Sequence, residues 1–158
     1  MSRDSPIRIR RENMFDEQLT FVNKTFKDKL DAIDFLIQEA KAAGKITGGE
    51  TYKKSVLQRE AEFSTAVGYE VAIPHGASDD VTESFVAVST IENPILWGEE
   101  SVRMIFMIGV PEHKRTKEHL QILAWLSRNL MHDDFRSNII NATTETQLFE
   151  CLSRLEQL

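Results

Sequence analysis

Hydrophobic residues recur along the first part of the chain at a spacing that predicts helices. The first segment has apolar positions three or four residues apart, at Leu30, Ile33, Ile37 and Ala40. Thr25 is available to cap this helix, and Gly44 is expected to end it. A second helix is predicted from Tyr52 to about Arg59, where it buries Val56. The pattern then lapses, which predicts a loop between Glu60 and Val67.

Short apolar runs predict strands in the middle of the chain. One run covers residues 71–73, stops at Pro74 and is followed at once by His75 and Gly76. It is typical of a buried strand. Two further strands are predicted over residues 85–88 and 102–108, and Asn93-Pro94 is expected to form the turn between them.

The last third of the chain is predicted to be helical. After Thr116, a possible N-cap, one apolar stripe is expected to include Leu120, Leu123, Ala124, Ser127 and Leu130. Another short helix is expected to bury Phe135, Ile139 and Ile140. Thr144 and Gln147 form a capping-box pattern before a final helix through Leu155. Helices precede, interrupt and follow the strands and no linker divides them, so the sequence predicts a single α/β domain.

The composition supports a single domain that needs no cross-link. A chain of 158 residues is long enough to bury a core without a disulfide or a structural metal. Its one cysteine, Cys151, excludes an internal disulfide and a zinc ribbon. Cys151 lies in an apolar helical stretch, so we expect a packed side chain. A reducing cytoplasm is the natural setting.

Charge and hydropathy narrow the choice of partners. The formal net charge of −6 argues against nucleic acid as the main partner, because phosphate binding needs a basic face. The longest apolar run, residues 105–110, is too short to cross a bilayer. Residues 1–13 are rich in arginine and no apolar segment follows them, so we interpret them as an N-terminal arm and not as a secretory signal.

Four histidines are candidates for chemistry. His132, beside two aspartates, and His113, in a charged segment that resembles a solvated loop, are expected to be surface or structural residues. His75 differs because it follows a buried strand, and ligands gather outside the carboxyl ends of strands in α/β sheets. Position alone favours a functional and a structural role of His75 equally.

Two further residues bear on the role of His75. His119 would occupy the first turn of a helix, where the dipole disfavours imidazolium and favours nearby anions. It could also only form a hydrogen bond at the end of the preceding loop. Arg59 ends a helix before the loop that leads to His75, so it is either a favourable charge at that helix end or a donor fork for phosphate.

Several other chemistries have no support in the sequence. The chain contains no G-x-x-x-x-G-K-[ST] or G-x-G-x-x-G loop, no H-E-x-x-H pattern and no G-x-S-x-G elbow. Adjacent carboxylates such as Asp79-Asp80 and Glu99-Glu100 are more typical of solvated turns than of acid–base pairs. A nucleotide site, a helical zinc site and a serine-hydrolase site are therefore not expected.

Four stretches are informative when taken together: "VLQRE", "STAVGYEVAIPHG", "WGEESVRMIFMIGVP" and "HLQILAWLSRNL". They resemble the enzyme IIA domain of the fructose–mannitol class of the phosphoenolpyruvate-dependent sugar phosphotransferase system. The resemblance runs from about Met14 to the C-terminus, which gives a domain over residues 14–158. It implies a mixed β-sheet flanked by helices on both sides. It also implies that His75 accepts a phosphoryl group from the carrier HPr and passes it to an enzyme IIB domain.

By the same resemblance, His119 is the second active-site histidine and Arg59 is the arginine near the phosphoryl group. A neutral histidine is available as a nucleophile near neutral pH, and the mechanism requires no metal or cofactor. Members of this family also include nitrogen-related regulatory proteins, so control of partner proteins is the alternative to sugar uptake. A pure binding module, or a hydrolase or metal-dependent enzyme that uses His75 and His119, would not explain why all three residues fit one phosphoryl-transfer pattern.

Overall fold

The computed structural model describes residues 15–115 and 117–154. The expected arm over residues 1–13, the possible cap Thr116 and the expected helix end at Leu155 lie outside the described residues. The described elements follow one another in this order: η1 (Glu17–Leu19), β1 (Thr20–Lys24), α2 (Lys29–Ala42), α3 (Glu50–Glu62), β2 (Ala66–Gly68), β3 (Val71–Ala72), β4 (His75–Ser78), β5 (Phe85–Trp97), β6 (Glu100–Pro111), η2 (Glu112–Lys114), α4 (Lys117–Leu130), α5 (Asp133–Asn141) and α6 (Glu145–Ser153).

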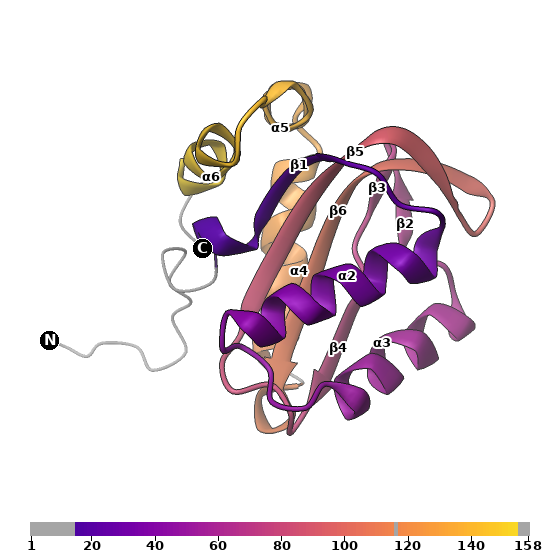
Figure 1. Cartoon of the computed structure of the whole chain (residues 1–158), viewed down its shortest axis with the longest axis vertical. Helices are drawn as coiled ribbons and strands as arrows, with labels where there is room; N and C mark the ends of the chain where they lie inside the picture. The colour runs from indigo at the N-terminus through magenta and orange to yellow at the C-terminus, as the bar shows by residue number, and fades with distance from the viewer. Residues whose placement is uncertain (1–14, 116, 155–158) are drawn as a thin grey trace, which may run out of the picture.

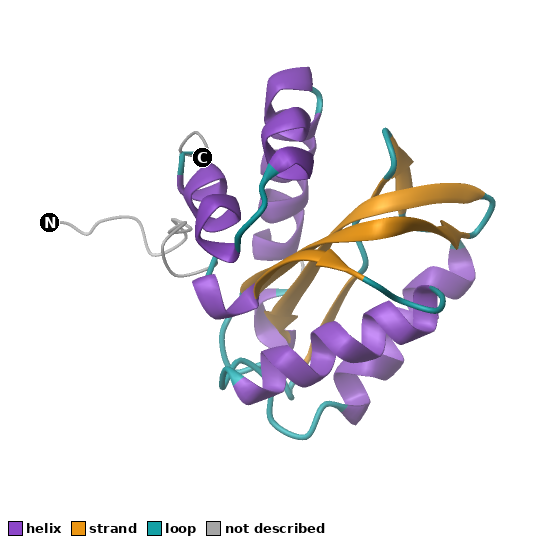
Figure 2. Cartoon of the chain, turned by 45° about the horizontal axis from the view of Figure 1, so that its top comes forward, coloured by secondary structure: helices purple, strands orange, loops and turns teal. Residues whose placement is uncertain are grey.

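The strands form one mixed sheet in the order β1-β5-β6-β3-β2, with β4 also paired to β6. β5 and β6 are antiparallel, β1 is parallel to β5, and both β3 and β4 are parallel to β6. Helices cover both faces: α2 and α3 lie on one face, and α4, α5 and α6 lie on the other (Figures 1 and 2). The predicted α/β domain with a mixed, doubly covered sheet is confirmed.

Alternation along β5 explains why the sheet needs helices on both faces. Phe85 and Ala87 belong to the core beneath α2 and α3, whereas Val86 and Val88 belong to the core beneath the C-terminal helices. Successive side chains of a strand point to opposite faces, and all four of these side chains are fully buried. An apolar run without polar positions therefore marks a strand that is covered twice.

β3 and β4 lie end to end along β6. Val71 pairs with Met104 and His75 pairs with Ile108, so both strands keep the same register against β6. Pro74 lies between them; it has no N–H to donate, although its carbonyl accepts a hydrogen bond of 2.9 Å from the amide of Ile108. His75 is thus the first residue of β4, directly after the short break between the two strands. His75 follows the carboxyl end of β3, as expected, but it begins a further strand and does not lie in a loop.

The N-terminal helices start and end at other residues than predicted. Asp28, not Thr25, caps α2, and its side chain accepts a hydrogen bond of 2.9 Å from the amide of Asp31. Gly44 follows the helix with φ +82°, as a glycine after a helix end often does. Ile33, Ile37 and Ala40 are buried, but Leu30 is 46% exposed. α3 extends to Glu62, and β2 occupies part of the predicted loop.

The turn predicted at Asn93-Pro94 was also wrong. These residues lie within β5, where the register against β6 shifts between Thr90 and Ile95. Proline is tolerated at such an irregularity because a shifted ladder leaves an amide position unpaired. The chain reverses after Trp97, where Gly98 has φ +65°, a conformation that favours glycine.

Of the stripe predicted for α4, Leu130 is buried and Leu123 packs against the core from a partly buried position, but the other three positions face away from the core. Leu120 is 62% exposed, and Ala124 and Ser127 are exposed too. The buried face consists instead of Ile122, Trp125, Leu126, Asn129 and Leu130. Apolar residues surround much of this helix, and the large Trp125 side chain gains most from burial, so it decides which face packs against the sheet.

The last two helices agree better with the pattern. Ile139 is buried, and Phe135 and Ile140 pack against the same core from partly buried positions. Thr144 caps α6 by accepting a hydrogen bond from the amide of Gln147. The capping box is only half formed, because the Gln147 side chain accepts from Thr143 and not from Thr144. Cys151 is half-buried and packs against this core.

Candidate active site

Helix α3 and strand β4 form the frame of the site, and polar contacts hold them together. The hydroxyls of Thr51 and Ser78 are 2.6 Å apart, and the amide of Ala77 donates a hydrogen bond of 3.1 Å to the hydroxyl of Ser55. Asp80 accepts hydrogen bonds of 3.1 Å from the amides of Gly49 and Thr51 at the start of α3. Later residues of α3 therefore contact earlier residues of β4, so the helix leads toward His75.

Gly76 allows the helix to approach the strand closely. A Cβ at this position would lie 2.9 Å from the hydroxyl oxygen of Ser55 and 3.1 Å from a methyl carbon of Val56. Such distances are too short for carbon atoms, so any side chain here would push α3 away from β4. The glycine after His75 is thus required by packing between these two elements.

A buried carboxylate holds the C-terminal end of α3. Glu60 accepts hydrogen bonds from the amide and the hydroxyl of Thr65 and from the indole N–H of Trp97, the last at 3.2 Å. The ammonium group of Lys29 lies 3.6 Å from the same carboxylate, whose side chain is 4% exposed. Because Glu60 faces inward, its neighbour Arg59 faces the site. The guanidinium of Arg59 also donates a hydrogen bond of 2.7 Å to the carbonyl of Phe63.

The ring of His75 is oriented by a backbone carbonyl. Its Nδ1 lies 2.8 Å from the carbonyl oxygen of Ile73. A carbonyl oxygen only accepts hydrogen bonds, so Nδ1 carries the hydrogen and Nε2 of the neutral ring keeps its lone pair. Burial lowers the pKa of His75 and the positive charge of Arg59 lowers it further, against the opposing effects of the Ile73 hydrogen bond and Glu60. The neutral ring, with Nε2 as the nucleophilic atom, is therefore the prevailing form at neutral pH.

His119 approaches His75 from the first turn of α4. The two rings lie edge to face, with centroids 4.7 Å apart and an interplanar angle of 74°. Burial, then the proximity of His75, Arg115 and Arg59, lowers the pKa of His119 to about 4. Its buried Nε2 has no hydrogen-bond partner within the described part of the chain. His119 is thus a second neutral imidazole with a ring nitrogen free for a ligand.

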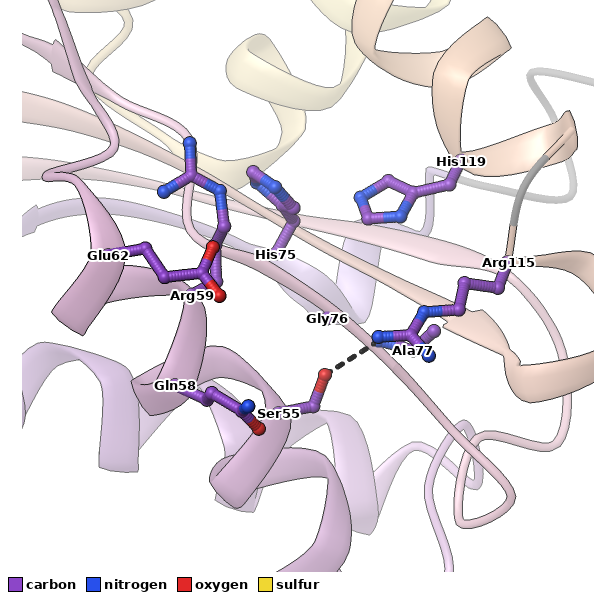
Figure 3. Close-up of a pocket in the computed structure, with 9 residues that line it drawn as sticks. All are labelled: Ser55, Gln58, Arg59, Glu62, His75, Gly76, Ala77, Arg115 and His119. Carbon is purple, nitrogen blue, oxygen red and sulfur yellow. Dashed lines mark hydrogen bonds between the residues drawn. The ribbon is translucent and has the colours of Figure 1, made fainter.

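These residues line one cleft with a volume of about 130 Å³. Figure 3 shows His75 between the Arg59 side chain, which comes from α3, and the His119 side chain, which comes from α4. The lining consists of Ser55, Gln58, Arg59, Glu62, His75, Gly76, Ala77, Arg115 and His119. Neutral imidazoles, guanidinium groups and a hydroxyl suit a small oxyanion such as a phosphoryl group. Within residues 15–115 and 117–154, no group of three histidine, cysteine or acidic side chains is arranged to hold a metal ion.

The structure brings the three site residues predicted from the sequence, His75, His119 and Arg59, into this one cleft. It leaves the other two histidines outside: His113 is exposed on η2, and His132 is exposed just before α5.

Four polar lining side chains were not singled out from the sequence: Ser55, Gln58, Glu62 and Arg115. Ser55 precedes Arg59 by one helical turn, and Glu62 follows Gln58 by one turn, so helical spacing from Arg59 could have indicated this face of α3. No comparable signal marked Arg115, which lies in the charged segment expected to be a solvated loop.

Two curated proteins resemble the chain closely over most of its length. A fructose-specific EIIA component from Haloferax volcanii is 33% identical over 130 residues, which cover 80% of this chain and 84% of that protein. The 2-O-alpha-mannosyl-D-glycerate-specific EIIABC component from Escherichia coli is 33% identical over 135 residues. That match covers 83% of this chain but only 20% of the Escherichia coli protein.

The fold is also known from experimental structures. The complex of enzyme IIA for mannitol with phosphorylated enzyme IIB from Escherichia coli contains a chain that aligns with a TM-score of 0.75 at 22% identity. The alignment covers 89% of this chain and 99% of that chain. At this level of identity, the likeness shows the fold alone. No helix in the described ranges combines the length and apolar character needed to span a membrane.

A family model is decisive for membership. The model described as "Phosphoenolpyruvate-dependent sugar phosphotransferase system, EIIA 2" matches residues 13–155, which is nearly the whole chain. The Haloferax volcanii relative, which this chain covers over most of its length, supports the same assignment. The chain therefore belongs to the EIIA 2 family of the phosphoenolpyruvate-dependent sugar phosphotransferase system and is a phosphotransferase component of that system.

Proposed function

We propose that this chain is a phosphocarrier for sugar uptake, and that Nε2 of His75 receives a phosphoryl group from phosphorylated HPr and passes it to an enzyme IIB domain. The observation that carries this proposal is the hydrogen bond from Nδ1 of His75 to the carbonyl of Ile73. It fixes the tautomer and leaves the Nε2 lone pair as the nucleophile in a cleft whose lining includes the guanidinium groups of Arg59 and Arg115, alongside one carboxylate, Glu62.

The transfer conserves charge and needs no external oxidant or metal. The lone pair of Nε2 forms a bond to phosphorus while the bond from phosphorus to the donor nitrogen breaks, and that electron pair stays on the imidazole of HPr. The phosphoramidate on His75 then gives up its phosphoryl group to the nucleophile of enzyme IIB in the same way. Nδ1 keeps its hydrogen throughout, and the Ile73 carbonyl stabilises the positive charge that develops on the ring.

Arg59 and His119 stabilise the group in transit. The Arg59 guanidinium offers a planar pair of N–H donors to the phosphoryl oxygens. His119 is neutral near pH 7, since its pKa is about 4, so it can donate a hydrogen bond without adding a full charge. Stabilisation of the equatorial oxygens is the main task in phosphoryl transfer, because there is little other covalent chemistry for the protein to do.

Partners have to dock at the mouth of the cleft. Phe63, whose carbonyl binds Arg59, is 75% exposed, and Leu120, next to His119, is 62% exposed. Two large apolar side chains beside a charged cleft are suited to contact a partner protein. A contact of Leu120 with HPr and enzyme IIB would explain why this residue is exposed, although the sequence pattern predicted it to be buried.

The proposal includes the domain and its setting. We propose residues 14–158 as the enzyme IIA domain, and the family match over residues 13–155 supports a domain of about this extent. The cytoplasm is the proposed location, because phosphoenolpyruvate-dependent transfer takes place there. Two relatives with 33% identity are named for sugar-specific components, which favours uptake over a regulatory role. The relative from Escherichia coli is about five times longer than the match, so its sugar is not assigned to this chain.

A phosphorylation assay tests the proposal. The purified chain is incubated with phosphoenolpyruvate, enzyme I and HPr, and bound phosphate is counted by intact-protein mass spectrometry. We expect one acid-labile, base-stable phosphate on the wild type, none on His75→Ala, and one on the control His113→Ala, because His113 lies outside the cleft. Phosphorylation of His75→Ala at the wild-type level would overturn the proposal.

A further inference from the structure

Arg115, at the end of η2 in the connection between β6 and α4, brings a positive charge to the lining of the cleft. Figure 3 shows its side chain extending below His119 toward Ala77, while Arg59 rises from α3 on the other side of His75. The cleft is therefore flanked by guanidinium groups that belong to different elements of the fold. A phosphoryl group between them has three oxygens to share.

The present partner of Arg115 is easily replaced. Its Nη1 lies 3.1 Å from a carboxylate oxygen of Glu112, and the two side chains are 63% and 42% exposed. Exposed ion pairs of this kind are weak, because water screens the charges and both side chains lose conformational freedom. A phosphoryl dianion, with three strong acceptor oxygens, competes well against one exposed carboxylate.

We propose that Arg115 is a second phosphoryl-binding arginine, which exchanges Glu112 for the phosphoryl group when His75 is phosphorylated. This inference rests on the proposed function of His75. Arg59 contacts the phosphoryl oxygens from the α3 side and Arg115 contacts them from the α4 side. While the cleft is empty, the guanidinium pairs with Glu112 instead. Arg115 takes part in no proton transfer, because its charge does not change.

The rate of transfer from phosphorylated HPr provides the test. We expect Arg115→Ala to slow phosphoryl acceptance roughly tenfold, less than the loss of a fully buried donor would, since Arg115 is partly exposed. Arg115→Lys keeps the charge but not the planar fork, so it should fall between wild type and Arg115→Ala. The matched control is Arg128→Ala, which removes an exposed arginine from α4 outside the cleft and should leave the rate unchanged.

Glu112→Gln separates phosphoryl binding from a purely structural role. If Arg115 binds the phosphoryl group, loss of the competing carboxylate should leave acceptance as fast as in the wild type or faster. If Arg115 only braces the loop through Glu112, Glu112→Gln should slow acceptance as much as Arg115→Ala does. If Arg115→Ala folds poorly, Glu112→Gln and Arg115→Lys can still be compared with the wild type, because both substitutions change the side chain less.

A direct readout is the pKa of the phosphoryl group, followed by ³¹P NMR of the phosphorylated chain. A nearby guanidinium favours the dianion, so Arg115→Ala should raise this pKa and Arg128→Ala should not. An unchanged phosphoryl pKa and an unchanged rate in Arg115→Ala, with wild type normally phosphorylated, would overturn the inference about Arg115 alone. Failure of the wild type itself to become phosphorylated would instead overturn the proposed function.

Discussion

His75 and His119 meet edge to face across the cleft, with ring centroids 4.7 Å apart. One ring begins β4 and the other lies in the first turn of α4, so the contact joins a strand and a helix that are distant in the sequence. The proximity of His75 disfavours a positive charge on His119, and Arg59 lowers the pKa of both rings. The arrangement keeps two neutral imidazoles side by side, which is the condition for one to act as nucleophile and the other as donor.

The low pKa of His119 makes stability depend on pH. The pKa is about 4 in the folded protein and 6.5 for an unperturbed histidine. Between these values the unfolded chain binds a proton that the folded chain does not, so the free energy of unfolding should fall as the pH drops from 6.5 toward 4. Allowing for the partial exposure of the ring, we expect His119 to account for a loss of about 1–2 kcal/mol.

Urea denaturation at several pH values checks this dependence on His119. The variant His119→Gln keeps a donor group but does not titrate, so it should lose less stability than the wild type on acidification. His75 contributes with the same sign and remains in both proteins. Equal losses in wild type and variant would show that His119 is protonated at its ordinary pH in the fold.

Substitution of Arg59 should affect transfer more than folding. Its guanidinium donates an exposed hydrogen bond to the carbonyl of Phe63 at the end of α3, so Arg59→Ala should change the free energy of unfolding by no more than about 1 kcal/mol. Phosphoryl acceptance from HPr should slow by roughly 100-fold. Arg59→Lys, which keeps the charge without the fork, should recover only part of the rate; full recovery by lysine would contradict bidentate binding.

Gly76→Ala should displace α3 from β4. The added Cβ would lie within 3.1 Å of three atoms, two of Ser55 and one of Val56. Overpacking of this kind destabilises by about 1–3 kcal/mol, and the shift of Arg59 relative to His75 should slow phosphoryl acceptance. The double variant Gly76→Ala/Ser55→Gly removes two of the three contacted atoms and should accept phosphate faster than Gly76→Ala alone. No recovery would mean that the clash with Ser55 is not the cause.

The buried Glu60 should matter for stability although it does not line the cleft. Glu60→Ala leaves the amide and the hydroxyl of Thr65 without their acceptor and Lys29 without its counter-ion, while the Trp97 indole keeps only the Thr65 hydroxyl as acceptor. We expect a loss of about 2–4 kcal/mol in the free energy of unfolding, measured by urea denaturation. Glu62→Ala, two residues along the same helix and exposed, is the control and should cost less than about 0.5 kcal/mol. Similar losses in both variants would contradict an anchoring role of Glu60.

The sequence predicted the layers of the fold better than the bounds of its elements. Apolar runs predicted strands β5 and β6, the family resemblance implied a mixed sheet covered on both faces, and the spacing of Ile33, Ile37 and Ala40 predicted the buried face of α2. The turn at Asn93-Pro94 failed because proline also occurs at irregularities within strands, and the short strand β1 was not recognised at all. The prediction of the buried face of α4 was wrong at most positions because the apolar residues of that helix suit two faces. Only packing against the sheet decides which of them is buried.

The site residues whose chemistry follows from their residue type could be predicted from the sequence. The features that depend on tertiary contacts could not. Histidine and arginine residues stand out in a sequence, and family resemblance joined His75, His119 and Arg59 before the structure placed them in one cleft. The hydrogen bond from His75 to the Ile73 carbonyl is set by backbone geometry beside Pro74, which residue types do not encode. Arg115 was missed because a charged loop residue is usually solvated, and only the fold shows that it faces the cleft.

The most direct test of the account is to locate the phosphate on the histidine ring. NMR of the ¹⁵N-labelled chain, phosphorylated through HPr, distinguishes phosphorus bound to Nε2 from phosphorus bound to Nδ1 by nitrogen chemical shifts and phosphorus–nitrogen coupling. The account predicts a single phosphoryl group on Nε2 of His75, with Nδ1 still protonated toward the Ile73 carbonyl. A phosphoryl group on Nδ1 of His75, or on His119, would contradict it.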